Sequence, residues 1–260
     1  MTSTDSHLSV TVLGSGTCTP STKRGHPANL VHFGSYRYLV DSGSGTIRRL
    51  VENGVRPVDL DALFYSHIHV DHVGDLFPIL FTLRNAYGQT RKRPLQVHGP
   101  PGFCRFFDHL AAVFPDCADN KHFTTHVVEM DSSPLTLPGG LRVQAFPMAH
   151  LEPSVGYRFT APSGQSVAIT GDTDVCPGLE QLVAGVDLVV AECSTPDDLK
   201  VAGHLSPTPL GEVCEAAGVR AVVLTHLYPP CDEVDVQEAV RRVFHGEVHV
   251  AEDGASYAVD

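Results

Sequence analysis

The sequence predicts an α/β protein with mixed strand pairing. Short runs rich in β-branched and aromatic residues recur along the 260-residue chain, and stretches with helical apolar spacing lie between them. This alternation favours sheets that carry helices on their faces. With 42% hydrophobic and 18% charged residues, the composition is that of a globular protein with ample apolar material for a core.

The predicted strands are short, and turn residues separate them. About a dozen such strands are too many for one small sheet. In chain order they are residues 8–13, 29–33, 37–40, 62–65, 95–98, 142–146, 154–159, 166–170, 187–191, 221–225, 247–251 and 256–259.

Helices are predicted between these strands, where apolar residues recur at helical spacing. Three of them have a proline near the first turn, where the missing N–H of Pro101, Pro177 or Pro207 is harmless. Gly54 and Gly218 stand where a helix C-terminus favours a residue with positive φ. The predicted helices are residues 46–53, 73–84, 101–114, 177–184, 207–217 and 234–244.

A single domain covering residues 1–260 is the predicted organisation, because this length is at the upper end of what one hydrophobic core serves. No fixed-period repeat or long linker divides the chain. The 7 cysteines form no Cys-x-x-Cys pair, and their odd number fits reduced thiols in the cytoplasm better than a disulfide framework. The polar N-terminus lacks a signal pattern, and no run of ~18 apolar residues predicts a membrane span.

The net charge of -12 is unfavourable for extended binding to nucleic acid, because an acidic surface repels polyanions. The densest basic cluster consists of Arg91, Lys92 and Arg93, and it ends at Pro94. We interpret this cluster as a solvated loop rather than as a phosphate contact.

A dense group of potential metal ligands follows the predicted strand 62–65. Residues 66–72 read Ser-His-Ile-His-Val-Asp-His. On an extended chain His67 and His69 point to the same side, whereas Asp71 and His72 lie on the turn that enters the next helix. Imidazole and carboxylate together are the usual ligands of zinc, so the pattern predicts a metal site rather than a histidine-rich surface turn.

Three further candidate ligands come later in the chain, each at the end of an apolar strand. They are His150, Asp172 and His226. Loops at strand ends are where α/β proteins assemble sites from distant parts of the sequence. Taken singly, each of these residues could instead be a satisfied histidine or a capping aspartate.

Together these residues resemble the metallo-β-lactamase-fold hydrolases. The resemblance extends from Leu13-Gly14-Ser15-Gly16 to His226, and it implies that family's four-layer αββα sandwich with two mixed β-sheets. It also implies two metal ions bridged by Asp172, and Asp41 matches a position that the family uses beside the metals. The implied ligands are His67, His69 and His150 for one ion and Asp71, His72 and His226 for the other. Zinc suits this imidazole-rich set, and manganese is the alternative.

Within that superfamily the chain is similar to the RNase Z-like branch. By this resemblance Glu192 orients His204, which donates a proton to the leaving group or stabilises charge on the phosphoryl oxygens, and both join Asp71 as candidate catalytic residues. Leu205-Ser206 departs from the Ser-Thr expected after that histidine, so an ordinary loop histidine remains the alternative. The similarity rests on Gly14-Ser15-Gly16-Thr17 with Pro20, on Gly99-Pro100-Pro101-Gly102, on residues 150–157, and on Glu192 followed by His204.

Phosphodiester hydrolysis is the chemistry that this pair of metal sites favours, because two ions ~3.5–4 Å apart stabilise both the attacking and the leaving oxygen of a displacement at phosphorus. The tRNA-processing enzymes of the branch carry a long arm, and residues 151–171, between His150 and Asp172, leave no room for it. Arg24-Gly25 also stands where those enzymes often show Arg-Asn. The leading hypothesis is therefore hydrolysis of a small phosphodiester, such as a cyclic nucleotide.

Three alternative functions remain open. The first is an RNase Z-like RNA 3′ endonuclease, and the second is a hydrolase of carboxylic esters, thioesters or lactones. The third is a metal-binding module without turnover, against which the complete ligand set argues, because a structural zinc needs no open coordination position. The expected partner is a small phosphodiester substrate rather than a membrane, and a homodimer is a further option, since homodimers are common in the branch.

Overall fold

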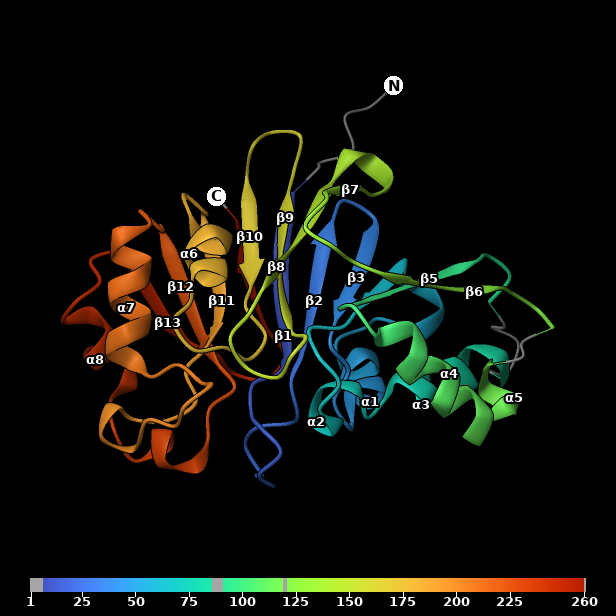
Figure 1. Cartoon of the computed structure of the whole chain (residues 1–260), viewed down its shortest axis with the longest axis horizontal. Helices are drawn as coiled ribbons and strands as arrows, with labels where there is room; N and C mark the ends of the chain where they lie inside the picture. The colour runs from blue at the N-terminus through green and yellow to red at the C-terminus, as the bar shows by residue number, and fades with distance from the viewer. Residues whose placement is uncertain (1–6, 86–90, 119–120, 260) are drawn as a thin grey trace.

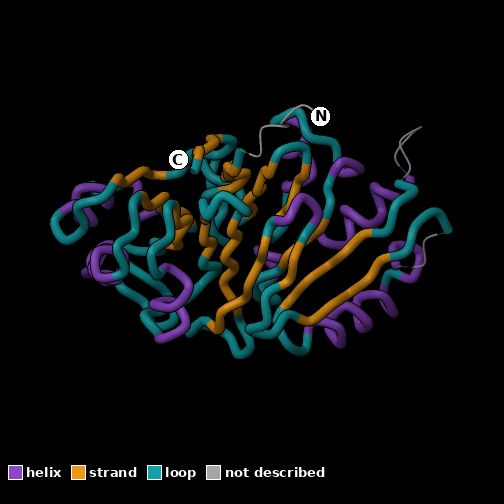
Figure 2. Tube along the Cα trace, turned by 90° about the horizontal axis from the view of Figure 1, so that it is seen from above, coloured by secondary structure: helices purple, strands orange, loops and turns teal. Residues whose placement is uncertain are grey.

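Two β-sheets packed face to face form the centre of the protein, and helices cover their outer faces (Figure 1). The computed structural model describes residues 7–85, 91–118 and 121–259. Viewed from above, the strands of the two sheets lie between an outer layer of helices on either side (Figure 2). The predicted α/β class and the αββα sandwich implied by the resemblance are both confirmed.

The first sheet has seven strands in the order β14-β1-β2-β3-β4-β5-β6. Neighbours from β14 to β3 are antiparallel, and neighbours from β3 to β6 are parallel. Its strands are β1 (Leu8–Gly14), β2 (Ala28–Phe33), β3 (Tyr36–Val40), β4 (Ala62–Phe64), β5 (Leu95–Gly99), β6 (Thr125–Glu129) and β14 (Ala255–Ala258).

The second sheet also has seven strands, in the order β13-β12-β11-β10-β9-β8-β7. Its neighbours are parallel from β13 to β10 and antiparallel from β10 to β7. Both sheets are therefore mixed, as predicted. Its strands are β7 (Leu135–Thr136), β8 (Arg142–Pro147), β9 (Val155–Thr160), β10 (Ser166–Ile169), β11 (Leu188–Glu192), β12 (Ala221–Thr225) and β13 (Glu247–Val250).

The helices divide between the two outer faces in chain order (Figure 1). Helices α1 to α5 cover the first sheet, and α6 to α8 cover the second. Four short 3-10 turns lie at Pro57–Asp59, Pro138–Gly140, Asp197–Leu199 and Pro229–Asp232. The α-helices are α1 (Thr46–Glu52), α2 (Val70–Val73), α3 (Leu76–Asn85), α4 (Phe103–Val113), α5 (Pro115–Ala118), α6 (Pro177–Val183), α7 (Pro207–Ala216) and α8 (Val236–Arg241).

Three elements were not predicted, and one predicted helix has a different start. Strands β6 and β7 were not predicted, because β6 is an edge strand with mostly exposed side chains and β7 has only two residues, so neither shows a buried apolar run. Helix α5 was also missed, and it has only four residues, none of them buried. The predicted helix 73–84 corresponds to α3, because α2 already ends at Val73 and residues 74–75 form a turn.

The basic segment at residues 91–93 is only partly the solvated loop that the sequence indicated. Lys92 and Arg93 are exposed, but the Arg91 side chain is buried at 3% exposure. Its guanidinium donates hydrogen bonds to the carbonyl oxygens of Leu60 at 2.6 Å and of Pro94 at 2.7 Å. The prediction was wrong for Arg91, whose charge is used to tie a loop to the first sheet.

A cluster of aromatic side chains fills the space between the sheets. The ring of Phe64 on β4 lies 5.4 Å from the rings of both Tyr157 and Phe159 on β9. The hydroxyl of Tyr157 donates to the carbonyl oxygen of Tyr65 at 2.7 Å, and the amide of Val155 donates to the carbonyl oxygen of Ser66 at 2.9 Å. These contacts fix the end of β4 against the second sheet, where the predicted ligands begin.

Two other expectations can be compared with the structure. All seven cysteines are unpaired, as the odd number and the spacing predicted. In the part of the chain that the structure describes, no helix has the length and apolar content needed to cross a membrane.

The packing of α6 on the end of β8 generates a stability prediction. A Cβ added at Gly178 would lie 1.7 Å from the backbone oxygen of Pro147, so Gly178→Ala forces the helix away from the sheet. We expect the free energy of unfolding in urea to fall by about 1–3 kcal/mol. Glu180→Ala, at an exposed position of the same helix, is the control, and equal stability of the two variants would contradict this packing argument.

Candidate metal centre

The seven predicted ligands come from the ends of four strands and meet at one edge of the sandwich. His67 follows β4, His150 follows β8, Asp172 follows β10 and His226 follows β12. Potential ligand atoms form one group on His67, His69, His150 and Asp172 and another on Asp71, His72 and His226, with the atoms of each group within 4.8 Å of one another. The structure therefore brings together all the residues that the sequence singled out as ligands.

In the first group, three imidazole nitrogens and one carboxylate oxygen face one another. Nδ1 of His69 lies 3.0 Å from Nε2 of His67 and 3.1 Å from Nε2 of His150. Oδ2 of Asp172 lies 3.7 Å from Nε2 of both His67 and His150. Four such donor atoms around one point suit a transition-metal ion of the zinc type.

In the second group, two imidazoles and two carboxylates face one another. Nε2 of His226 lies 3.7 Å from Oδ2 of Asp71, and Nε2 of His72 lies 4.0 Å from the same oxygen. The second carboxylate oxygen is Oδ1 of Asp172, which lies 3.3 Å from Nε2 of His72 and 3.4 Å from Nε2 of His226. Because Oδ2 of Asp172 faces the first group, this residue occupies the bridging position that the resemblance implies.

Buried polar atoms without hydrogen-bond partners show that a cation fits the second group. Nε2 of His72, Nε2 of His226 and Oδ1 of Asp172 are all buried and unpartnered. Such atoms are rare in folded proteins, because each one loses its bonds to water without replacement. A metal ion accepts electron pairs from all three atoms at once, and it thereby replaces the hydrogen bonds that these atoms lack.

The electrostatic surroundings of the imidazoles agree with this fit. Burial lowers the pKa of His67 to about 2, so its ring is neutral and has a free electron pair for a metal. Burial also opposes charge on His72, but the carboxylates of Asp172 and Asp41 outweigh it and raise the pKa of His72 well above its usual value. The carboxylates thus create a site that favours positive charge.

Hydrogen bonds to Nδ1 orient three of the ligand rings. Nδ1 of His72 donates to Oδ2 of Asp41 at 2.9 Å, and Nδ1 of His150 donates to the carbonyl oxygen of Gly203 at 2.9 Å. Nδ1 of His226 lies 3.0 Å from Oγ of Ser194. Each bond leaves Nε2 directed at the centre, which is how outer partners fix the tautomer of a metal-bound histidine.

One member of the second group, His226, and one residue that contacts it, Asp41, which bonds to His72, have strained backbones. Asp41 has a φ of 59° and His226 a φ of 54°, and they are the non-glycine residues with positive φ in the described chain. Asp41 is held in place by the amide and the hydroxyl of Ser66, each of which donates to its carboxylate at 2.8 Å. Strain of this kind clusters at functional sites.

The predicted pair of His204 and Glu192 is formed. Nδ1 of His204 donates to Oε2 of the buried Glu192 at 3.0 Å. Burial opposes charge on His204, but this bond and the carboxylate charge raise the pKa of His204 above its usual value. His204 also joins a third potential ligand group with Asp172 and His226, but its Nδ1 is already bonded to Glu192.

Sequence reasoning missed the residues that support these groups. Ser194 bonds to both His226 and the carboxylate of Glu192, and Ser66 bonds to Asp41. Gly203 contributes only its carbonyl oxygen, which carries no sequence signal. The sequence marks the two serines only by their positions next to predicted site residues. Ser66 precedes His67, and Ser194 lies two residues after Glu192.

His98 and Cys193 lie outside the ligand groups. His98 is buried and stacks on Phe64 with ring centroids 4.7 Å apart, and burial lowers the pKa of His98 to about 4. Cys193 is fully buried in the core beside the second sheet, and it behaves as a small apolar residue.

The αββα sandwich and the strand-end ligand groups define a metallo-β-lactamase-fold hydrolase. Residues 36–227 match the family described as "Beta-lactamase superfamily domain". A "Ribonuclease Z" of Mycobacterium sp. (strain KMS) is 30% identical over an alignment of 276 residues, gaps included. The alignment covers 95% of this chain and 94% of that protein. The chain belongs to the beta-lactamase superfamily and to its RNase Z-like metal hydrolases.

Two solved structures are similar over almost the whole chain. The metallo-beta-lactamase fold protein YhfI from Bacillus subtilis has a TM-score of 0.83 and 24% identity, and 97% of this chain and 99% of that chain are covered. The short form of human tRNase Z has a TM-score of 0.78 and 24% identity, with the same coverage of 97% and 99%. At this level of identity, the two structures support the assignment of the fold alone.

The first ligand group generates a prediction about metal content. His69 is exposed, so His69→Ala removes one donor with little effect on packing. We expect the variant to contain less metal than the wild type after dialysis, measured by inductively coupled plasma mass spectrometry, with an unchanged circular dichroism spectrum. His109→Ala, an exposed histidine on α4, is the control, and wild-type metal content in the His69 variant would contradict the ligand role.

Proposed function

We propose that the protein is a dinuclear metal-dependent phosphodiesterase that acts on a small phosphodiester, with a cyclic nucleotide as one candidate. The observation that carries this proposal is the pairing of two donor groups through Asp172, whose two oxygens face different groups. Residues His67, His69 and His150 would hold one ion, and Asp71, His72 and His226 the other. When bound, the two ions supply charge stabilisation for a displacement at phosphorus.

Zinc is the metal we propose, with manganese as the alternative. Five of the seven proposed ligands are imidazoles, which suit zinc better than the hard cations that prefer oxygen. The seven unpaired cysteines favour a reducing compartment, so we place the reaction in the cytoplasm.

His204 is positioned to give a proton to the leaving group. Its bond to Glu192 fixes the ring through Nδ1, so Nε2 points away from Glu192. The His204 ring lies 4.6 Å from that of His150 and 5.8 Å from that of His226, between the proposed ligands of the two ions. The direction of the shift in the pKa of His204, raised by the hydrogen bond to Glu192 and by its charge, favours the protonated ring that a general acid requires.

The size of the substrate is inferred from the segment between His150 and Asp172. Most of residues 151–171 form the hairpin of β9 and β10, and five residues connect its strands. This leaves no segment that could serve as an arm for tRNA, and the net charge of -12 offers no replacement for phosphate contacts. A small phosphodiester needs few contacts beyond the metal centre.

An RNA 3′ endonuclease is the second candidate, and one observation favours it. The mycobacterial relative that is 30% identical to this chain is named Ribonuclease Z, and the match covers 94% of its length. The same metal centre would serve both reactions, so the difference lies in the substrate that reaches it.

A panel of substrates tests the proposed function. The purified protein, loaded with zinc or manganese, is assayed on bis(p-nitrophenyl) phosphate, cyclic AMP, a tRNA precursor, a thioester and a lactone. We expect cleavage of one or both small phosphodiesters with the tRNA precursor intact. Cleavage of the tRNA precursor alone would favour the endonuclease, whereas carbonyl cleavage alone would move the protein to the esterases and lactonases.

The proton-donor role of His204 has its own test. We expect His204→Ala to lower kcat on cyclic AMP or on another alkyl phosphodiester by about 10²–10⁴-fold, because the leaving alkoxide then lacks its proton donor. Metal content should match that of the wild type, and the effect should be much smaller on bis(p-nitrophenyl) phosphate, whose leaving group needs no proton. Loss of metal in this variant would show instead that His204 is a ligand.

A further inference from the structure

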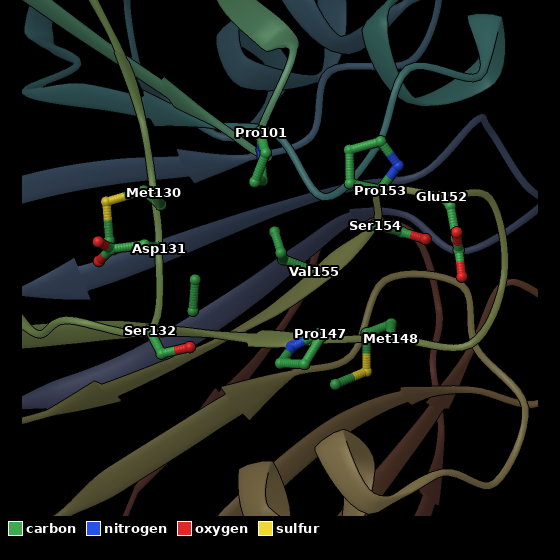
Figure 3. Close-up of a pocket in the computed structure, with 11 residues that line it drawn as sticks. Pro101, Met130, Asp131, Ser132, Pro147, Met148, Glu152, Pro153, Ser154 and Val155 are labelled. Carbon is green, nitrogen blue, oxygen red and sulfur yellow. The ribbon is translucent and has the colours of Figure 1, made fainter.

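A cavity of about 580 Å³ lies between the two sheets, and its walls come from both of them. Pro101 follows β5 and Met130 follows β6 in the first sheet, whereas Pro147 and Met148 lie at the end of β8 and Val155 begins β9 (Figure 3). The volume is within the range of about 300–1,000 Å³ that small-molecule sites occupy.

The cavity adjoins the metal centre through shared backbone. Its wall residues Met148 and Glu152 lie two positions on either side of His150. Cα atoms two positions apart in a chain are at most about 7 Å apart, so the Cα atoms of both wall residues lie within about 7 Å of the Cα atom of His150. On the other wall, the amide of Val155 donates to the carbonyl of Ser66, the residue before His67.

The walls of the cavity suit a flat apolar group. Met130, Met148 and Val155 are buried, and prolines from both sheets complete the apolar surface. Methionine thioethers adapt to irregular shapes and make favourable contacts with aromatic rings. A planar ring can therefore lie between the two sheets here.

The polar side chains of the cavity restrict the charge of the group that can bind there. Asp131 and Glu152 are exposed and lie on opposite sides of the ring of labelled residues (Figure 3). None of the 11 described lining residues is basic. Carboxylates accept hydrogen bonds from N–H groups and repel a second phosphate, so the cavity favours a group with N–H donors and no negative charge.

We propose that this cavity binds the organic group of the phosphodiester, and that this group is a flat ring with N–H donors and no negative charge, such as an amino-bearing nucleobase. The inference rests on the proposed function, because it places the phosphoryl group at the metal centre and the ring between the sheets. It also disfavours an oligonucleotide along this route, since the next phosphate would meet Asp131 or Glu152.

A matched pair of variants separates the cavity from its surroundings. Ser132 lines the cavity and Ser133 does not, and both are exposed in the same loop. Ser132→Trp fills the cavity, and Ser133→Trp is the control. The chain contains no tryptophan, so the emission of the single introduced ring reports its environment, and a blue shift is expected only for Ser132→Trp.

Equilibrium dialysis of the metal-loaded proteins tests binding without turnover, with adenosine 5′-monophosphate and inorganic phosphate as probes. The wild type should bind the nucleotide more tightly than phosphate, because phosphate lacks the ring that occupies the cavity. We expect Ser132→Trp to weaken nucleotide binding about 10-fold or more, because the introduced ring takes the place of the base against the apolar walls, and Ser133→Trp to leave it unchanged. Equal nucleotide affinity in the wild type and Ser132→Trp, or equal affinity of the wild type for nucleotide and phosphate, would overturn the inference.

A kinetic comparison separates this inference from the proposed function. Adenosine 5′-(p-nitrophenyl phosphate) and methyl p-nitrophenyl phosphate share one leaving group, and only the first carries a base. We expect the wild type to prefer the adenosine ester about 10-fold or more in kcat/KM, and Ser132→Trp to lose that preference. If neither ester is cleaved but Ser132→Trp still loses nucleotide binding, the phosphodiesterase proposal fails and the cavity assignment stands. Cleavage of both esters without preference would overturn the cavity assignment alone.

Discussion

The architecture of the site depends on one buried carboxylate. Asp172 is 3% exposed, and its oxygens lie within 4.0 Å of ring nitrogens on five histidines, which follow β4, β8, β11 and β12. Burial of a lone carboxylate is costly unless positive charge compensates it. Burial raises the pKa of Asp172, but the imidazoles hold that pKa well below its usual value. Strand ends from both sheets therefore have to meet at one edge.

Packing between the two sheets determines how the strand ends that carry the ligands are positioned. Phe64 on β4 packs against Tyr157 and Phe159 on β9, and backbone bonds from Val155 and Tyr157 hold the end of β4. The ligand-bearing loops thus begin from a rigid, apolar support. The outer bonds of His72, His150 and His226 then fix each ring, so each Nε2 is directed at the centre.

Local patterns predicted much of this arrangement. The spacing of His67, His69, Asp71 and His72 specifies their directions, and strand-end positions marked His150, Asp172 and His226. The sequence did not reveal partners that act through a backbone atom or one hydroxyl, such as Gly203 and Ser194, because any residue with that geometry suffices. Strand β6 was not predicted, because an exposed edge strand lacks apolar periodicity. The burial of Arg91 was not predicted, because it depends on carbonyl groups that only the folded chain brings together. The cavity between the sheets has no local signature, since its walls come from distant segments.

The positive φ angles of Asp41 and His226 bear on how such a protein can diversify. A left-handed conformation costs an L-residue about 1–2 kcal/mol, and here the contacts around the metal centre sustain it. Changes near these two residues would disturb stability and chemistry together. The cavity walls, with side chains such as Ser132 and Glu152 that are exposed and free of such strain, carry no comparable penalty. Under the proposal that the cavity binds the organic group of the substrate, substitutions in its walls can change substrate preference without disturbing these two strained residues.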